Sequence, residues 1–141
     1  MIIVHPDSTL NIGPGVEVNF QDHYKFIVNG LLNAEGTEQD SILFTTEYTL
    51  MGWNGIRFLG AVDSSHLSYC IFEYGRALGV EMNTDSWGGA IFCEYSNPVI
   101  RHCTFRDNYA EWYGGAMEVD YSSPVIDHCV FTDNTAASSA G

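Results

Sequence analysis

The sequence predicts an all-β protein, wound as a right-handed parallel β-helix of about five rungs. Two observations carry this prediction. Residues 88–113 and 114–136 repeat each other at a constant sequence offset of 26, which is typical of stacked structural repeats. Within each copy the apolar runs are short and alternate with polar residues, so they favour strands over helices. Short strands joined by turns make one rung per repeat, and the handedness of parallel crossovers favours a right-handed coil.

Residues 1–54 are predicted to form irregular leading rungs. The chain here contains short alternating apolar runs, separated by glycine and proline residues that end strands. The expected strands are residues 10–12, 16–20, 26–28, 31–34 and 42–45, and the breaks between them are Gly13-Pro14-Gly15, Gly30 and Gly36.

Residues 55–141 are predicted to form regular rungs with one excursion. Cys70-Ile71-Phe72 matches Cys103-Thr104-Phe105, but the offset here is 33 and not 26, so this rung is longer than the later ones. The spacing from Gly55 to Cys70 is almost the same as that from Gly89 to Cys103 in the next rung. The extra residues therefore come after the strand that contains Cys70. We therefore expect residues 76–87 to leave the coil as an excursion.

The last two rungs have the 26-residue period and match most closely. A Gly-Gly step opens each of them, a proline separates two strands, and an Asp-Asn pair ends the third strand. The matched positions are Gly88-Gly89-Ala90 with Gly114-Gly115-Ala116, Ser96 with Ser122, Pro98-Val99-Ile100 with Pro124-Val125-Ile126, His102-Cys103 with His128-Cys129, and Phe105, Asp107-Asn108 and Ala110 with Phe131, Asp133-Asn134 and Ala136.

These rungs resemble the parallel β-helix repeat of the pectate-lyase-like superfamily, especially that of large bacterial secreted and surface proteins. The leading segments Ile12-Gly13-Pro14-Gly15-Val16 and Trp53-Asn54-Gly55-Ile56 resemble the first rungs of such proteins. The resemblance covers nearly the whole chain, and it implies the fold and a secreted or cell-surface location. It implies no single function, because this architecture serves lyases, hydrolases, adhesins and passive stalks alike.

Length and charge limit the classes of partner. A chain of 141 residues can bury the core of one domain, which we expect to span residues 1–141. The formal net charge is −13, with only five lysine and arginine residues, which argues against nucleic acid and anionic membrane surfaces. No apolar run reaches the length of about 18 residues that spans a bilayer, so membrane insertion is not expected. Residues 1–6 lack the pattern of a signal peptide.

The end of the chain predicts an open ladder. Ala140-Gly141 follow the Gly114-Gly115 step at the offset of the repeat, where a further rung would begin. We therefore expect the chain to be a piece of a longer protein. Because uncovered strand edges tend to pair with another chain, we also expect end-to-end self-association.

Two columns of equivalent residues are expected inside the coil. Cys70, Cys103 and Cys129 share one position and should stack as small apolar side chains. Parallel stacking points their Cβ atoms the same way, which favours free thiols over disulfides. Asn108 and Asn134 end the third strand in successive rungs, where they are expected to form a buried amide ladder that satisfies backbone groups.

Two columns of acidic residues are candidates for calcium binding. Glu94 aligns with Asp120, and Asp107 aligns with Asp133, which brings like charges about 4.8 Å apart. Such pairs extend into solvent, share a proton or hold a hard cation through carboxylate oxygens. A pair of carboxyl groups is also what glycoside hydrolysis needs. The sequence requires no cofactor, and Ca²⁺ is the ion that these columns would fit.

Exposed aromatic residues are candidates for glycan binding. The residues just before the two Gly-Gly steps should meet through stacking, and two tyrosines after strands should form an outward column. Rings and neighbouring polar groups hold sugars, which makes a polysaccharide or cell-surface glycan the expected partner. The alternative is that the rings only pack the excursion against the coil. The candidates are Trp87, Trp112, Tyr113, Asp85, Glu111, Tyr95 and Tyr121.

Three classes of function are compatible with these patterns. A structural or adhesive segment of a secreted or cell-surface protein is favoured, because every strong pattern serves stacking. A glycan-binding surface without catalysis and a carbohydrate-active enzyme, either a polysaccharide lyase or a glycoside hydrolase, are the alternatives. The net charge of −13 disfavours anionic uronate polymers as substrates. No catalytic motif of the superfamily can be matched, so no catalytic residue is assigned.

Overall fold

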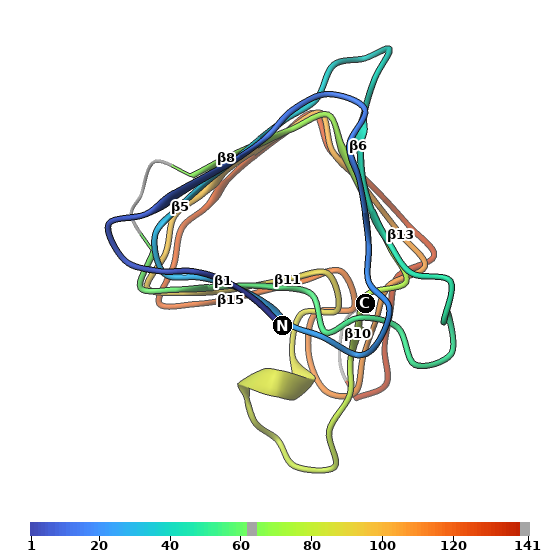
Figure 1. The fold of residues 1–141 in the computed structure, drawn as a ribbon. Helices are drawn as coiled ribbons and strands as arrows, with labels where there is room; N and C mark the ends of the chain where they lie inside the picture. The colour runs from blue at the N-terminus through green and yellow to red at the C-terminus, as the bar shows by residue number, and fades with distance from the viewer. Residues whose placement is uncertain (62–64, 139–141) are drawn as a thin grey trace.

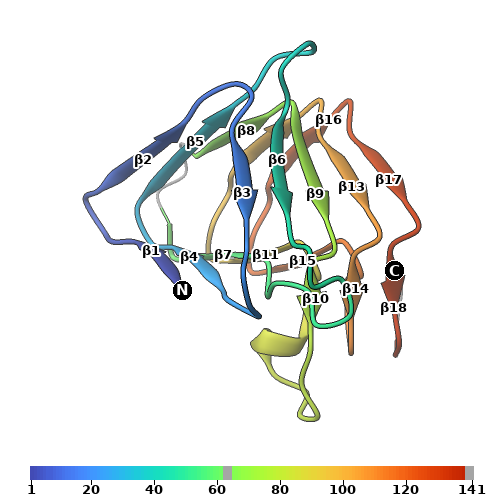
Figure 2. The same cartoon turned by 45° about the vertical axis from the view of Figure 1, so that its right-hand side comes forward.

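The computed structural model describes residues 1–61 and 65–138. In this part of the chain, five successive rungs stack along one axis, and each rung contributes one strand to each of three five-stranded parallel sheets. Seen along the axis, the rungs superpose as a three-sided outline, and seen obliquely they follow one another from the N-terminal to the C-terminal end (Figures 1 and 2). The predicted parallel β-helix of about five rungs is confirmed.

The strands recur in the same order in every rung. Sheet A contains β1 (Ile2–Val4), β4 (Phe26–Val28), β7 (Ile56–Leu59), β11 (Ile91–Glu94) and β15 (Met117–Asp120). Sheet B contains β2 (Thr9–Ile12), β5 (Leu31–Glu35), β8 (His66–Ser68), β12 (Val99–Arg101) and β16 (Val125–Asp127). Sheet C contains β3 (Glu17–Asn19), β6 (Ile42–Thr45), β9 (Cys70–Glu73), β13 (Thr104–Arg106) and β17 (Val130–Thr132).

A fourth, smaller sheet begins only in the third rung. This sheet, which we call sheet D, contains β10 (Arg76–Ala77), β14 (Tyr109–Ala110) and β18 (Thr135–Ala136). Its strands follow those of sheet C after a sharp bend. The predicted excursion at 76–87 is therefore wrong at its first two residues, because Arg76 and Ala77 pair with Tyr109 and Ala110.

The excursion leaves the coil after Ala77 and carries one turn of 3₁₀ helix, η1 (Thr84–Ser86). Asn83 caps this turn, since its side chain accepts a hydrogen bond from the backbone N–H of Asp85. The excursion returns at Trp87, which pairs with Tyr113. Among the described residues, no helix has the length and hydropathy needed to cross a membrane.

The register of the sheets follows the repeat seen in the sequence. Ile91 lies opposite Met117 in the next rung and opposite Ile56 in the preceding one. Strand β1 was not predicted: it precedes the first expected strand and pairs with β4. Its apolar residues Ile2 to Val4 are too few to show a period, so only the partner strand reveals it.

The core consists of inward columns of apolar side chains, as the alternation predicts. One column of phenylalanines runs through sheet C, with ring centroids 4.9 Å apart from Phe44 to Phe72, 4.9 Å from Phe72 to Phe105 and 4.8 Å from Phe105 to Phe131. Offset or parallel aromatic contacts at this spacing add to the stabilisation from burial. The strand spacing thus sets the ring spacing, and each ring covers the one before it.

The cysteines lie in the expected inward positions, and no disulfide joins them. Cys70 and Cys103 are buried and Cys129 is half-buried. Each of these three thiols donates to a backbone carbonyl of the preceding rung, as that of Cys70 does to Ala34 at 3.4 Å. On sheet A, burial raises the pKa of the Cys93 thiol to about 12, so this group is an inert apolar filler.

The last rung leaves its inward side chains uncovered by any described residue. The exposed fraction reaches 42% for Val119, 46% for Ile126 and 47% for Phe131, whereas the equivalent positions of the preceding rung are fully buried. These side chains line a hollow of about 420 Å³ at the end of the coil. Over the described residues, the expected uncovered ladder is therefore present. The predicted start of a further rung, Ala140-Gly141, lies outside the described residues.

Candidate functional site

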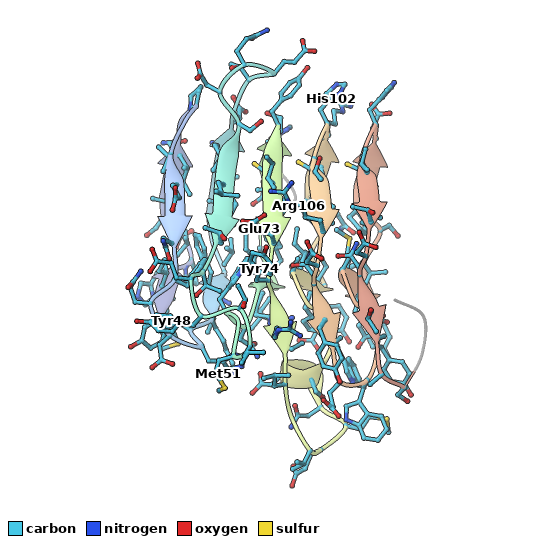
Figure 3. All side chains as sticks on the ribbon, turned by 90° about the vertical axis from the view of Figure 1, so that its right-hand side faces the viewer. Tyr48, Met51, Glu73, Tyr74, His102 and Arg106 are labelled. Carbon is cyan, nitrogen blue, oxygen red and sulfur yellow. The ribbon has the colours of Figure 1, made fainter. Side chains whose placement is uncertain are left out.

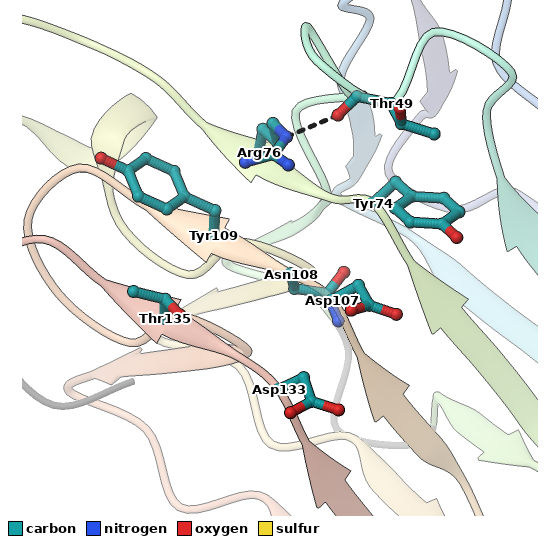
Figure 4. Close-up of a pocket in the computed structure, with 8 residues that line it drawn as sticks. All are labelled: Thr49, Tyr74, Arg76, Asp107, Asn108, Tyr109, Asp133 and Thr135. Atoms are coloured by element: carbon teal, nitrogen blue, oxygen red, sulfur yellow. Dashed lines mark hydrogen bonds between the residues drawn. The ribbon is translucent and has the colours of Figure 1, made fainter.

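A groove lies at the bend between sheets C and D. It encloses about 230 Å³ and combines acidic, hydroxyl, amide, guanidinium and aromatic groups. Because its residues occupy equivalent positions in successive rungs, the groove follows the axis of the coil. It is lined by Thr49, Tyr74, Arg76, Asp107, Asn108, Tyr109, Asp133 and Thr135 (Figure 4).

The floor of the groove is a column of residues with a left-handed backbone. Tyr74, Asp107 and Asp133 have φ values of 58°, 55° and 53°. Residues other than glycine rarely adopt this backbone conformation, because it costs about 1–3 kcal/mol for each residue. Aspartate tolerates it better than most residues do. The bend requires this conformation, and as a result each of the last three rungs presents one side chain outward at the same corner.

The residues just after the floor point inward and fix the bend. Asn108 accepts a hydrogen bond from the backbone N–H of Gly75 at 2.9 Å and donates one to the carbonyl of Phe72 at 3.0 Å. Asn134 repeats the pattern one rung later, accepting from the backbone N–H of Asn108 at 3.1 Å and donating to the carbonyl of Phe105 at 2.9 Å. The predicted amide ladder is confirmed, although Asn108 is buried and Asn134 is only half-buried, and it ties the groove floor to the neighbouring rungs.

Sheet D forms one wall of the groove. Arg76, Tyr109 and Thr135 are paired in register, so they succeed one another along the axis. The Arg76 guanidinium lies 5.6 Å from the centre of the Tyr109 ring, and its Nε donates to the carbonyl of Thr49 at 2.7 Å. Burial and the hydrogen bond that the phenol donates to Glu111, at 3.1 Å, raise the pKa of Tyr109. This hydrogen bond and the Arg76 guanidinium hold the Tyr109 ring in the wall.

Sheet C bears an ion pair next to the floor. The Glu73 carboxylate is buried, accepts a hydrogen bond from Thr45 at 2.8 Å and lies 2.6 Å from Nη2 of Arg106. Glu73, Tyr74 and Arg106 lie beside one another on this face of the coil (Figure 3). Arg106 compensates the charge of Glu73, so the negative charge of the groove comes from Asp107 and Asp133. The Asp107 carboxylate has no hydrogen bond or ion pair with any residue that the structure describes.

The two acidic columns have the predicted register. Glu94 lies opposite Asp120, and Asp107 and Asp133 occupy the same corner in successive rungs. Over the described residues, no group of three or more histidine, cysteine, aspartate and glutamate side chains could hold a metal ion. Each column thus offers two carboxylates to an ion that takes about six to eight oxygens. Calcium binding here stays a prediction.

Millimolar Ca²⁺ is expected to raise the melting temperature modestly if an acidic column binds it, because a ligand of the folded state stabilises that state by mass action. The measurement is a thermal melt with Ca²⁺, with chelator, and with NaCl at equal ionic strength. The double variant Asp107→Asn/Asp133→Asn should lose the shift if the groove is the site, and Glu94→Gln/Asp120→Asn if the other column is. An equal shift in NaCl, or none, would identify both columns as solvated surface.

The aromatic candidates fall into two separate groups. Trp87 and Tyr113 meet edge to face, with centroids 5.6 Å apart, and Trp87 also contacts Phe92 at 6.0 Å. The indole nitrogens of Trp87 and Trp112 are buried without a hydrogen-bond partner among the described residues. These rings pack the excursion against the coil, which is the second of the two arrangements expected. Glycan binding by them stays a prediction, but their contacts lie within the molecule.

The second group is exposed. Tyr95 and Tyr121 stack with centroids 4.9 Å apart and an angle of 8° between planes, and 61% and 74% of their surfaces are exposed. They lie at the corner between sheets A and B, away from the groove. Of the remaining candidates, Glu111 contacts the groove residue Tyr109, and Asp85 lies on the excursion, where it pairs with Lys25 at 2.7 Å.

Several groove residues were missed in the sequence, although a signal for them exists. The offset of 33 that relates Cys70 to Cys103 also places Tyr74 on Asp107 and Arg76 on Tyr109. Arg76 was assigned to the excursion, which concealed this match. Thr49 has no such signal, because it lies on a loop that reaches the groove only through folding.

Comparison with known proteins agrees with this architecture. No curated protein and no solved structure matches the chain. The family model described as "Right handed beta helix region" matches residues 15–140, which includes nearly all of the rungs. The match confirms the right-handed winding expected for parallel crossovers. The chain therefore belongs to the right-handed β-helix family.

Proposed function

We propose that this chain is a non-catalytic β-helix segment of a secreted or cell-surface protein, and that it holds a glycan in the groove between sheets C and D. One observation carries the proposal: the groove places two tyrosines, exposed carboxylates and hydroxyl groups along the axis of the coil. Sugars are recognised by an apolar ring face combined with a few convergent polar groups. The rest of the coil supports this surface and gives it length, as a stalk or an adhesive segment would.

The shape of the groove favours an extended polymer. Each of the last three rungs has this corner, so a ligand that runs along the axis meets Tyr74, then Asp107, then Asp133, spaced by about 4.8 Å. Tyr109 and Thr135 flank this path on the same side. A chain of sugars would contact the corner residues of successive rungs, whereas a compact ligand would contact only one of them.

The two aspartates support binding more than hydrolysis. A glycosidase divides the work between two carboxyl groups, one of which is kept protonated by its surroundings. Asp107 and Asp133 occupy equivalent corners of successive rungs and both are exposed. Neither carboxyl group is buried, and burial is a usual means by which a glycosidase makes its acid differ from its base.

A carbohydrate-active enzyme is the second candidate, because the same groove does contain a pair of carboxyl groups. Its test is the release of new reducing ends, or of unsaturated products, when the chain is incubated with soluble polysaccharides. The variant Asp107→Asn/Asp133→Asn is the matched control. Activity that this variant loses would replace binding by catalysis as the function of the groove.

The binding proposal is tested with the variant Tyr109→Ala. The test uses a glycan that the intact chain binds. Removing the ring is expected to raise the dissociation constant for this glycan about tenfold, which corresponds to about 1.4 kcal/mol. Affinity electrophoresis in gels containing different polysaccharides finds the ligand, and calorimetry gives the dissociation constant. The variant Tyr121→Ala removes an exposed ring at the other corner. If Tyr121→Ala weakens binding and Tyr109→Ala does not, the glycan site is the Tyr95–Tyr121 column and not the groove.

A further inference from the structure

Arg57 is a buried cation without an ion-pair partner among the described residues. It lies on the outer face of sheet A, between Ile27 and Phe92, yet only 2% of it is exposed. Within the same part of the chain, the hydrogen bonds of its guanidinium go to neutral oxygens. Desolvation lowers the pKa of Arg57 to about 9, against the attraction of Asp85. A buried charge of this kind is costly, and it suggests a specific task.

The guanidinium holds the end of the excursion. Residues 78–88, which we call the strap, lie with Thr84 and Asp85 against the outer face of sheet A at this point. Nη1 of Arg57 donates to the carbonyl of Trp87 at 2.6 Å and to that of Gly88 at 2.8 Å. Its Nε and Nη2 donate to Oδ1 of Asn54 at 3.1 and 3.0 Å, and Asn54 in turn donates to the carbonyl of Asp85 at 3.1 Å.

The aromatic contacts of Trp87 do not fill the whole space between the strap and sheet A. A cavity of about 50 Å³ remains between the strap and the sheet, beside Arg57 and Phe92. The strap also leaves the indole N–H of Trp87 buried without a partner among the described residues, a defect that costs about 1–3 kcal/mol. Its tip extends into solvent, with Val80 97% exposed. The polar contacts of Arg57, together with the outer pair of Lys25 and Asp85, therefore hold the strap in place.

The strap in turn supports the segment that follows strand β14. The carbonyl of Ser86 accepts a hydrogen bond from the backbone N–H of Trp112 at 3.2 Å, and the backbone N–H of Gly88 donates to the carbonyl of Tyr113 at 2.8 Å. Strand β10 contacts η1 directly. Since each strand of sheet D has only two residues, the wall that carries Tyr109 depends on these neighbours for its position.

We infer that Arg57 is a positioning residue, which fastens the strap to sheet A and thereby fixes the sheet D wall of the groove. The fastening stands on its own, while its effect on glycan affinity rests on the proposed function. Arg57 thus acts on the groove through the strap, from the other side of sheet D, and would not contact a ligand in the groove.

Hydrogen exchange of the Arg57→Met variant tests the fastening. Amide exchange is expected to become at least about tenfold faster at residues 85–88 and 109–113, and to stay unchanged at the sheet B residue Ile100. Arg101→Met is the matched control, because Arg101 is a half-exposed arginine 3.8 Å from Asp127 and should leave both regions unchanged. The variant Lys25→Met loosens the strap from outside and gives the same local pattern if Arg57→Met fails to fold.

The outcomes separate the inference from the proposed function. Unchanged exchange at 85–88, or equally faster exchange in sheet B, would overturn the inference, since Arg57 would then have no local role. A loosened strap with an unchanged 109–113 segment would overturn the positioning of the wall. When a glycan ligand is known, Arg57→Met should weaken its binding as Tyr109→Ala does. A chain that binds no glycan removes the proposed function, and the exchange pattern still decides the role of Arg57.

Discussion

Replacing Asn108 with leucine is expected to lower the free energy of unfolding by about 3 kcal/mol or more, because each buried group left without a partner costs about 1–3 kcal/mol. The leucine would leave the backbone N–H of Gly75 and the carbonyl of Phe72 without their present partner. It would also break the link to Asn134. Urea unfolding monitored by circular dichroism measures the change.

His102→Ala is the control for this prediction. His102 lies one strand earlier in the same rung, also has a left-handed backbone, and stacks on Tyr69 with its ring exposed. Its removal should change the free energy of unfolding by about 0.5 kcal/mol or less, as expected for surface positions. If the two variants shift the unfolding midpoint equally, the amide ladder does not stabilise the bend as we describe.

Self-association of the chain through its last rung is the second large effect that we expect. Val119, Ile126 and Phe131 present an apolar surface, and the C-terminal edge strands β15, β16 and β17 each have a described partner on one side only, as β1, β2 and β3 do at the other end. Such edges recruit further strands, and a contact between two equivalent ends closes a dimer, whereas a head-to-tail contact propagates. Sedimentation velocity from micromolar to millimolar concentration distinguishes these outcomes from a monomer.

The variant Phe131→Lys should abolish this association, because it places a charge in the uncovered cross-section. Val130→Lys is the matched control, since Val130 lies on the same strand, is 56% exposed and points to the outer face. A strictly monomeric chain at millimolar concentration would show that the apolar end is not adhesive. Equal loss of association in both variants would place the contact on the outer surface of sheet C.

The repeat made the coil predictable, and its interruption concealed the site. Cys103 and Cys129 are one repeat of 26 residues apart, so they occupy the same position in successive rungs. Their column could therefore be predicted from the spacing alone. The fourth sheet was missed because its strands have two residues, too few for an alternating pattern. Arg76 was therefore assigned to the excursion, and the wall of the groove could not be recognised.

The burial of Arg57 could not be predicted for a different reason. Its position on β7 is an outward one, and in a bare coil an outward arginine would lie in solvent. It is buried only because the strap folds over it, and nothing in the spacing of residues 78–88 shows where that segment lies. The contacts of an irregular segment depend on the whole fold, whereas the contacts between rungs follow from the constant sequence offset of the repeat.

The corners of the last two rungs also bear on how such a protein changes in length. Residues 88–113 enter and leave through the same Gly-Gly step and the same left-handed corners as the rung that follows. A tandem duplication of this segment in the gene would thus insert a complete rung without any new turn. The groove would grow by about 4.8 Å, with one more acidic corner and one more wall residue. The length of the groove is therefore set by the number of rungs, and selection can change that number by one with each duplication.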